Sequence, residues 1–380
     1  MHSEHSQTGT GQTAPPESLI AAAALSRVHG LGPRLTTALL DHFGSAAAVL
    51  RQPRKTLQQV PGLGPVVADH IVQCDRQEVM AYLSRCRQLG VALYQPQDVE
   101  YPPQLSEIVD APPLLHCRGS LLAQDHLAIG IVGSRRCSPY GTRQAERLAG
   151  ALARAGFTIV SGLARGIDAA AHRGALTAGG RTIAVLATGL EFIYPPEHQE
   201  LAMQITEQGA LISECPLDQK PLRGLFPQRN RIVSGMALGV IIVEATSRSG
   251  ALHTARHAME QGREVFAVPG PVESRTSEGC HDLIRDGVSL IRGVEDVLDQ
   301  LGPLATPARP DSDKTVHHPR ELVLNPQESE ILNAISTTAT PIDDVVRATR
   351  LDPSRVLATL TVLEMRLFVR RLPGNMVIRT

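Results

Sequence analysis

The feature that most constrains this fold is a repeated pattern. An apolar run ends in a short turn of glycine and serine, and a helical pattern follows. The first run, 128–133, ends in Gly133-Ser134 and leads into apolar positions at helical spacing. Two later runs, 157–161 and 239–243, are also followed by turns that contain serine and glycine. Strands that alternate with helices predict an α/β domain with a Rossmann-like, doubly wound parallel sheet. The carboxyl ends of such strands meet at one crevice, where ligands bind.

We expect seven strands and six helices in this domain. The strands are expected at 128–133, 157–161, 182–187, 210–213, 239–243, 264–268 and 288–291. The helices are expected at 141–155, 166–178, 197–208, 229–237, 251–261 and 278–286. A proline-rich segment, about 91–122, precedes them, and we expect it to wrap the sheet edge.

The turns differ from known nucleotide-cofactor fingerprints. The glycines of the first turn do not complete G-x-G-x-x-G, and Ser161-Gly162 stands where a ribose-binding acid is expected. The chain also has no G-K-[ST], so we expect neither NAD binding nor ATP hydrolysis, and no cofactor. A glycine turn between strand and helix instead exposes backbone N–H groups that suit an anion. We therefore assign Gly133, Ser134, Arg135, Ser161 and Gly162 to a phosphate seat.

A second positive segment lies between two of the expected strands. Arg229 and Arg231 could bind phosphate oxygens through paired hydrogen bonds, and Lys220 adds a nearby charge. Asn230 could bond a base or orient the loop, and Phe226 could stack on a base. The same segment could instead be the start of a helix with solvated charges. Together with the glycine turns, it predicts an anion-binding floor in the crevice.

Taken together, these motifs resemble the bacterial DNA-processing protein A family (DprA, also called Smf). They occur in the family's order over about 98–301, and they are Gly133-Ser134-Arg135, Ser161–Asp168, Tyr194-Pro195, Phe226–Ile232, Val243–Ala245 and Ser249–Ala255. The resemblance implies that the core binds single-stranded DNA, forms a homodimer and helps to load the RecA recombinase. His253 and His281 depart from the family's pattern, and the second departure leaves open whether its loop touches the ligand.

Composition favours an intracellular protein whose DNA contacts are local. The 380 residues carry a formal net charge of −1, so binding to DNA must depend on patches of positive charge. Tryptophan is absent and aromatic residues are scarce, which disfavours an aromatic stacking platform. The six cysteines lack C-x-x-C spacing, so free thiols in the cytoplasm are expected rather than zinc. The first 16 residues are polar and contain no apolar h-region, so we expect no signal peptide.

The segment 17–90 contains the same short sequence motif twice. Val28–Pro33 and Val60–Pro65 each place two glycines around an apolar residue before a proline and a helical pattern. This arrangement resembles the tandem helix-hairpin-helix (SAM-like) domain, whose backbone N–H groups can face a DNA phosphate. Because Arg34 is the one basic residue placed just after these glycines, a purely structural role remains an equal alternative.

The rest of the chain divides into short and modular parts. Residues 1–16 are expected to be a disordered tail, 91–301 the core and 302–320 a flexible linker. The last domain, 321–380, shows three helical patterns followed by two strands around a glycine turn, which predicts a winged helix. Its arginines, such as Arg370, could meet DNA or could be ordinary surface charge.

The residues and the resemblance together favour a non-enzymatic single-stranded DNA binder that acts as a recombination mediator. The resemblance implies that it protects incoming single-stranded DNA and loads RecA during natural transformation. Two alternatives remain open. One is an enzyme related to nucleotide 5′-monophosphate phosphoribohydrolases, although 245–254 lacks the Gly-Gly pair and the glutamate of their P-G-G-x-G-T-x-x-E loop. The other is a regulator that binds duplex DNA through the winged helix. We expect no metal site and no membrane partner.

Overall fold

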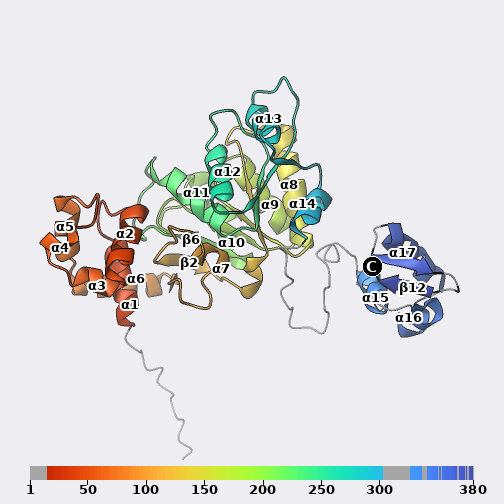
Figure 1. Ribbon diagram of the computed structural model, residues 1–380, viewed down its shortest axis with the longest axis horizontal. Coiled ribbons are helices and arrows are strands. Elements are labelled where there is room, and N and C mark those ends of the chain that lie inside the picture. Colours follow the sequence, from red (N-terminus) through yellow and green to blue (C-terminus); the bar gives the residue numbers. More distant parts are fainter. Residues whose placement is uncertain are drawn as a thin grey trace, which may run out of the picture.

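An open nine-stranded sheet with helices on both faces forms the centre of the protein (Figure 1). The computed structural model describes residues 15–302, 326–335, 340–349, 351, 353–365, 368–372, 374 and 376–379. Within these ranges no helix combines the length and the apolar character needed to cross a bilayer. The predicted tail, 1–16, and linker, 302–320, lie almost wholly outside the described residues.

The sheet has the strand order β1-β2-β6-β5-β4-β3-β7-β8-β9. Its strands are β1 (Ala92–Tyr94), β2 (Leu115–Gly119), β3 (Ala128–Val132), β4 (Thr158–Ser161), β5 (Thr182–Val185), β6 (Ala210–Ser213), β7 (Gly239–Ile242), β8 (Glu264–Ala267) and β9 (Ser289–Leu290). Strands β3 to β9 run parallel, whereas β1 and β2 form an antiparallel edge. The strand order changes direction between β3 and β7, and this switch point opens a crevice at their carboxyl ends.

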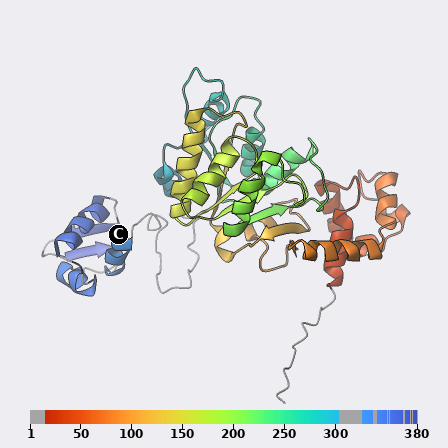
Figure 2. The ribbon, with the colours of Figure 1, turned by 180° about the vertical axis from the view of Figure 1, so that it is seen from behind.

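Alternate residues of the strands pack against helices on opposite faces. In β5, Ile183 and Val185 belong to the core on one face, while Ala184 belongs to the core on the other. The first face is covered by α7 (Pro103–Ser106), α11 (Leu225–Gly235), α12 (Ala251–Glu260) and α13 (Glu278–Arg285). Figure 2 shows the other face, covered by α8 (Pro139–Arg154), α9 (Ile167–Thr177) and α10 (Gln199–Gln208).

The predicted fold class is confirmed, and every strand and helix expected in the core is present. The largest difference in a boundary is at α11, which begins at Leu225 rather than at 229. Pro227 lies in its first turn, where a missing N–H breaks no helical hydrogen bond. The proline-rich segment contains two strands that were not predicted, β1 and β2, and α14 (Val294–Leu301) was also missed.

The N-terminal part is a tandem of helical hairpins. Its helices are α1 (Glu17–Ser26), α2 (Pro33–Phe43), α3 (Ala46–Leu50), α4 (Arg54–Leu57), α5 (Pro65–Val72) and α6 (Arg76–Gln88). Gly30 and Gly62 have φ angles of +83° and +85°, which other residues rarely adopt. A Cβ on Gly62 would lie 3.5 Å from Leu35, whereas one on Gly30 would lie 3.3 Å from Val67. Each hairpin turn thus packs against the helix that follows the other.

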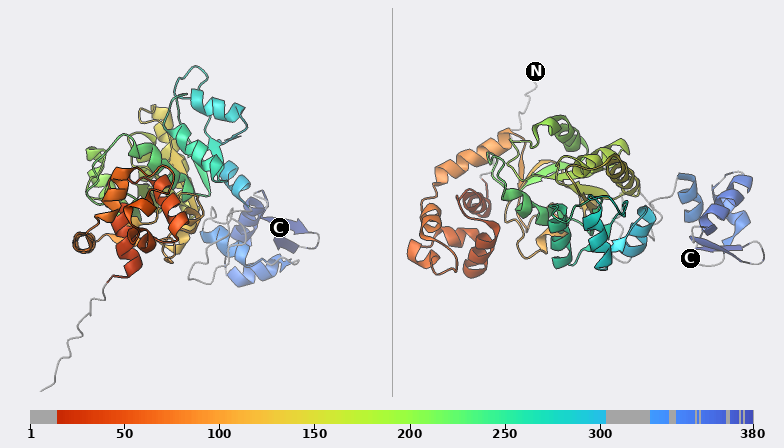
Figure 3. Two further views of the ribbon diagram at one scale, coloured as in Figure 1. Left: turned by 60° about the vertical axis from the view of Figure 1, so that its left-hand side comes forward. Right: turned by 90° about the horizontal axis from the view of Figure 1, so that it is seen from above.

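Helices α1 and α6 join the hairpins to the sheet beside β2 and β6 (Figure 3). The hydroxyl of Tyr82 on α6 lies 2.6 Å from His116 Nε2 and accepts a hydrogen bond from the Leu217 N–H at 3.1 Å. Since His116 Nδ1 lies 3.2 Å from the Ser213 carbonyl oxygen, it donates there, and Nε2 accepts the Tyr82 O–H. These three buried groups satisfy one another and hold the helical part against the core.

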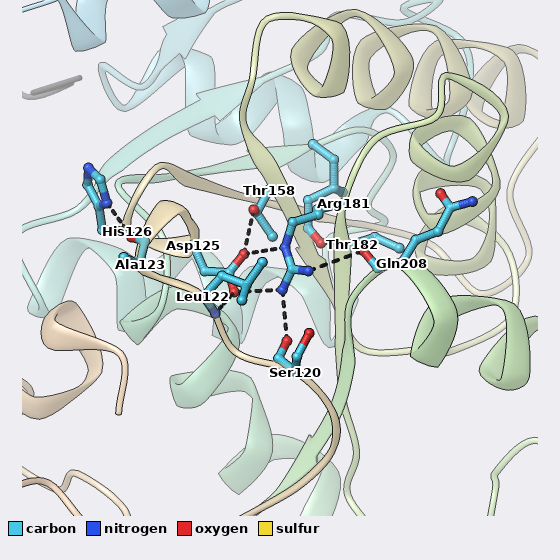
Figure 4. Close-up of polar contacts among 10 residues, drawn as sticks. Ser120, Leu122, Ala123, Asp125, His126, Thr158, Arg181, Thr182 and Gln208 are labelled. Atoms are coloured by element: carbon cyan, nitrogen blue, oxygen red, sulfur yellow. Dashed lines mark hydrogen bonds and ion pairs between the residues drawn. The ribbon is translucent and has the colours of Figure 1, made fainter. Parts of the chain in front are cut away.

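An ion pair between Arg181 and Asp125, here called the charged clamp, lies at the amino ends of the parallel strands, away from the crevice (Figure 4). Arg181 donates two hydrogen bonds of 2.8 Å to the two carboxylate oxygens of Asp125 and a third to the Ser120 carbonyl oxygen. Asp125 also accepts from the Thr158 hydroxyl and the Leu122 N–H, each at 2.8 Å. The clamp therefore ties the segment that leads into β3 to the first residue of β4 and to the residue that precedes β5.

The C-terminal part has the helices and strands of a winged helix. Helices α15 (Pro326–Asn333), α16 (Ile342–Thr349) and α17 (Pro353–Met365) pack with the strands β10 (Thr340–Pro341), β11 (Val369–Leu372) and β12 (Met376–Arg379). The strand order is β10-β12-β11, and both pairings are antiparallel. The three predicted helices and both predicted strands are present, and β10 is an additional short strand.

The joint between Tyr82 and His116 predicts a pH-dependent stability. Burial lowers the pKa of His116 to about 4, so it is neutral in the fold but titrates near 6.5 when unfolded. The stability that depends on neutral His116 is therefore fully present above pH 6.5. As the pH falls toward 4, the free energy of unfolding decreases by about 3 kcal/mol in total. Thermal melting from pH 7.5 to 4 should show a steeper loss for the wild type than for His116→Gln.

His172 is common to both proteins and cancels in this comparison. Its buried ring also has a lowered pKa, of about 3, so it adds the same acid sensitivity to each. Parallel melting curves for the wild type and His116→Gln would show that His116 does not couple protonation to unfolding.

Candidate functional site

A pocket of about 760 Å³ opens at the carboxyl ends of β3 and β7. Its lining residues are drawn from the segments 132–136, 162–168, 194, 223–233, 246–254 and 276, although not every residue of each segment faces the pocket. Arg135, Arg136, Arg223 and Arg229 line it, and Asp168 is the one acidic residue among the described lining. The crevice predicted at the strand ends is therefore present, and its walls are positively charged.

Glycines let the two loops beneath the pocket approach closely. A Cβ on Gly133 would lie 2.6 Å from Ile167 Cγ1 and 2.9 Å from the Glu244 carbonyl oxygen. Gly166 has a φ of +75°, and a Cβ there would collide with the Ser134 carbonyl oxygen. That oxygen also accepts a 3.2 Å hydrogen bond from the Ile167 N–H. The phosphate-seat loop is thus fixed against the start of α9.

Arg229 lies beneath the pocket and is 5% exposed. Its Nη1 donates to the Gly162 carbonyl oxygen at 2.6 Å and also to that of Val185. A Cβ on Gly162 would collide with the guanidinium group. Burial lowers the pKa of Arg229 to about 10, although the Asp168 carboxylate opposes this effect. Arg229 therefore stays charged at neutral pH and joins α11 to the ends of β4 and β5.

Asp168 holds the turn between β4 and α9. Its carboxylate accepts hydrogen bonds from the N–H groups of Gly162 and Ala164, at 3.1 and 3.3 Å. Leu163 lies between them with a φ of +57°, a conformation that costs energy for a residue other than glycine. Burial raises the pKa of Asp168, and the charge of Arg229 works against that rise. Asp168 ends the motif 161–168 recognised in the sequence, but its contacts with the turn were not foreseen.

An aromatic and cationic row lies above this floor. The Arg135 guanidinium carbon is 5.1 Å from the centre of the Phe226 ring, and the Tyr194 ring meets Phe226 edge-to-face at 5.5 Å. Arg135 and Tyr194 are exposed, so the row faces solvent. A flat ring between a guanidinium group and a second ring suits a stacked base.

Seven of the ten predicted site residues line the pocket. They are Gly133, Ser134, Arg135, Gly162, Phe226, Arg229 and Asn230. Asn230 Oδ1 accepts a 3.3 Å hydrogen bond from Arg229 Nε, and its Nδ2 donates to the Gly250 carbonyl oxygen at 3.3 Å. Asn230 thus links α11 to the turn before α12.

Three predicted residues lie elsewhere, and the expectations for two are corrected. Ser161 is fully buried and donates its hydroxyl hydrogen to the Ile131 carbonyl oxygen at 2.6 Å, so it offers nothing to a ligand. Arg231 is buried in ion pairs with Asp110 at 3.0 Å and Glu214 at 2.6 Å. Lys220 is exposed but outside the pocket lining.

Sequence reasoning missed several lining residues. Arg136 directly follows the predicted seat, and Arg223 precedes Phe226, so their charge was the available signal. Tyr194 was part of the recognised pattern but received no role. His253 lines the pocket, whereas His281 does not and instead lies 3.1 Å from the Gly270 carbonyl oxygen. Across the described ranges, no group of three His, Cys, Asp or Glu side chains is arranged as metal ligands would be.

Two of the four pocket arginines, Arg135 and Arg229, should differ in their effect on stability. Arg229→Ala should lower the free energy of unfolding by about 3–5 kcal/mol, because it leaves Asp168 buried without its cation. Arg135→Ala should change it by less than about 0.5 kcal/mol, since that side chain is exposed. Urea unfolding of both variants measures the difference. Equal midpoints for the two variants would contradict a structural role for Arg229.

Each of the three parts of the chain matches a known family model. The family model for DNA recombination-mediator protein A matches residues 92–302, the DprA winged helix domain matches 305–375, and the SAM-like helix-hairpin-helix tandem matches 22–74. Protein Smf of Synechocystis is 34% identical over 92% of this chain and 96% of its own length.

Two solved structures are similar to the fold. The X-ray structure of DprA from Streptococcus pneumoniae has a TM-score of 0.65 and 36% identity, and covers 74% of this chain and 96% of that one. A structure of DprA from Helicobacter pylori, which concerns its single-stranded DNA binding mode, has a TM-score of 0.50 and 30% identity, and covers 56% and 95%. The chain therefore belongs to the DNA recombination-mediator protein A family, that of the Smf and DprA proteins.

Proposed function

We propose that the pocket binds single-stranded DNA and that the protein acts as a recombination mediator. The observation that carries this proposal is the row of Arg135, Phe226 and Tyr194 above a positively charged floor. A guanidinium group beside two rings can hold a phosphate and a stacked base at the same time. The single-stranded DNA binding described for the H. pylori relative supports the same assignment.

Several pocket groups suit a strand that runs along the crevice. The exposed Arg135, Arg136 and Arg223 are free to neutralise phosphates. The buried Arg229 adds positive electrostatic potential from beneath the pocket. Gly133 and Ser134, in the turn that follows β3, line the pocket, and an anion bound there would meet the backbone of this turn. Bases that stack must be unpaired, so the pocket should favour a single strand over a duplex.

We further propose that the bound strand is delivered to RecA, that the protein works as a homodimer in the cytoplasm and that it protects incoming DNA during natural transformation. The family relationship supports this part. Titration of labelled protein with purified RecA, with and without single-stranded DNA, tests the partner. Absence of saturable binding under both conditions would reject RecA as the partner.

We also propose that the protein is not an enzyme. The two acidic groups near the pocket are engaged in holding backbone. Asp168 binds the turn after β4, and Glu244 accepts hydrogen bonds from the Ser138 N–H at 2.8 Å and its hydroxyl at 2.5 Å. Neither carboxylate is placed as a free general base. The segment 245–254 also lacks the Gly-Gly turn of the phosphoribohydrolases.

The binding proposal predicts a distinct behaviour for each member of the row. Arg135→Ala should weaken binding to single-stranded DNA by about 1.5–3 kcal/mol. It should also reduce the salt slope by about 0.7, as one phosphate contact is lost. Phe226→Ala should weaken binding by about 1–3 kcal/mol with an unchanged slope, because stacking releases no counterions. Salt-titrated fluorescence anisotropy measures both quantities.

Arg135→Lys is the matched control, since it keeps the charge but loses the paired donors. It should retain the salt slope and recover part of the affinity. If a duplex of equal length binds as tightly as the single strand at the same salt concentration, the pocket assignment is wrong. Loss of binding in Arg370→Ala, with normal binding in Arg135→Ala, would move the site to the winged helix.

The non-enzymatic proposal predicts no release of free base from nucleoside monophosphates by purified protein. Chromatography of the reaction mixture over several hours is the measurement. Turnover that survives further purification and disappears in Glu244→Ala would establish the enzyme instead.

A further inference from the structure

Four exposed arginines line a groove between α8 and α9, on the face of the sheet away from α11 and α12. The groove has a volume of about 590 Å³. Arg143, Arg147 and Arg154 come from α8, and Arg173 comes from α9. The three α8 residues are four and seven positions apart, so they follow one stripe of the helix.

Helices α8 and α9 lie side by side (Figure 2), and two glycines allow their close approach. A Cβ on Gly174 would collide with the Glu146 carbonyl oxygen, and one on Gly150 would lie 3.1 Å from the Gly174 carbonyl oxygen. The floor of the groove between Arg147 and Arg154 therefore carries few side chains. Charged groups can reach over it from both walls.

The positive charge of this groove is not neutralised within the described chain. Arg143, Arg154 and Arg173 form no ion pair there, and Glu146 is the one acidic residue of the described lining. Arg147 donates to neutral oxygens of Gln144 and Arg292, at 2.7 and 2.5 Å. Like charges four residues apart destabilise a helix, so Arg143 beside Arg147 has a cost that an anionic ligand would remove.

The groove begins near the pocket. Helix α8 starts at Pro139, directly after the loop that contributes Arg135 and Arg136 to the pocket wall. Its 16 residues span about 24 Å, from the crevice toward the other end of the sheet. Arg143 lies near the crevice end of this helix and Arg154 at the far end.

We propose that the groove between α8 and α9 is a second nucleic-acid site, which holds the sugar–phosphate backbone of a single strand that continues out of the pocket. This inference rests on the proposed function of the pocket. The groove offers arginines and no ring, so it should bind phosphates without regard to sequence. A protein partner is less well matched, because Leu176 and Ala178 are the main apolar side chains in the lining and interfaces need an apolar centre.

Oligonucleotides of two lengths separate the groove from the pocket. One, of about six nucleotides, fills the pocket alone, and one of about twenty also reaches the groove. The variant carries Arg143→Gln, Arg154→Gln and Arg173→Gln together. It should bind the long oligonucleotide at least about tenfold more weakly, with a salt slope lower by about 2 for three lost phosphate contacts. Its affinity for the short one should stay within about twofold.

The matched control removes three exposed positive charges elsewhere, through Arg51→Gln, Lys55→Gln and Arg87→Gln. Equal weakening by the control would overturn the proposal, because net charge alone would then explain the effect. Unchanged long-strand binding in the groove variant would overturn it too, and would leave the groove to an acidic protein. If the wild type fails to bind the short oligonucleotide, the pocket assignment fails first and the groove proposal with it. Melting temperatures of all three proteins confirm that each is folded.

Discussion

The pocket depends on the buried guanidinium group of Arg229. A cation removed from water is costly unless hydrogen bonds and an opposite charge replace its hydration. Here two carbonyl oxygens at the ends of β4 and β5 and the nearby Asp168 supply them. Gly162 is required because any side chain there would occupy the space of the guanidinium group. One side chain thereby fixes how α11 sits on the sheet, and α11 carries Phe226 into the pocket.

This arrangement separates the polar groups of the site into two layers. The lower layer holds the backbone in place: Asp168 binds the turn around Leu163, and Glu244 binds Ser138 at the N-cap of α8. The upper layer, with Arg135 and Phe226, faces solvent. Residues in the lower layer respond to mutation through stability, whereas those in the upper layer should respond through binding. Charged residues of one motif therefore have different physical roles.

Residue type predicted which segments form the site, but not which side chains face it. The strand-and-turn pattern located the crevice because parallel strands share one carboxyl edge. It was not used to orient Arg229 and Arg231, although both already lay inside the helix predicted at 229–237. On a helix two residues apart means about 200°, so the two arginines cannot face one pocket. Ser161 failed for a related reason. Its small hydroxyl satisfies a neighbouring strand carbonyl, a contact that depends on sheet register and not on spacing along the chain.

Because the net charge is near zero, the positions of the arginines determine where the protein can attract a polyanion. A formal charge of −1 over the whole chain supplies no general attraction for a polyanion, so local fields must do so. Many exposed arginines elsewhere are paired, as Arg285 is with Asp282 at 3.0 Å. Those of the pocket rim and of the groove between α8 and α9 lie among few carboxylates. Unpaired like charges on adjacent turns repel one another, and a fold without a ligand gains nothing from them. Their concentration along one edge and one helical groove is what a continuous chain of phosphates would favour, because each phosphate bound there relieves a repulsion already present in the free protein.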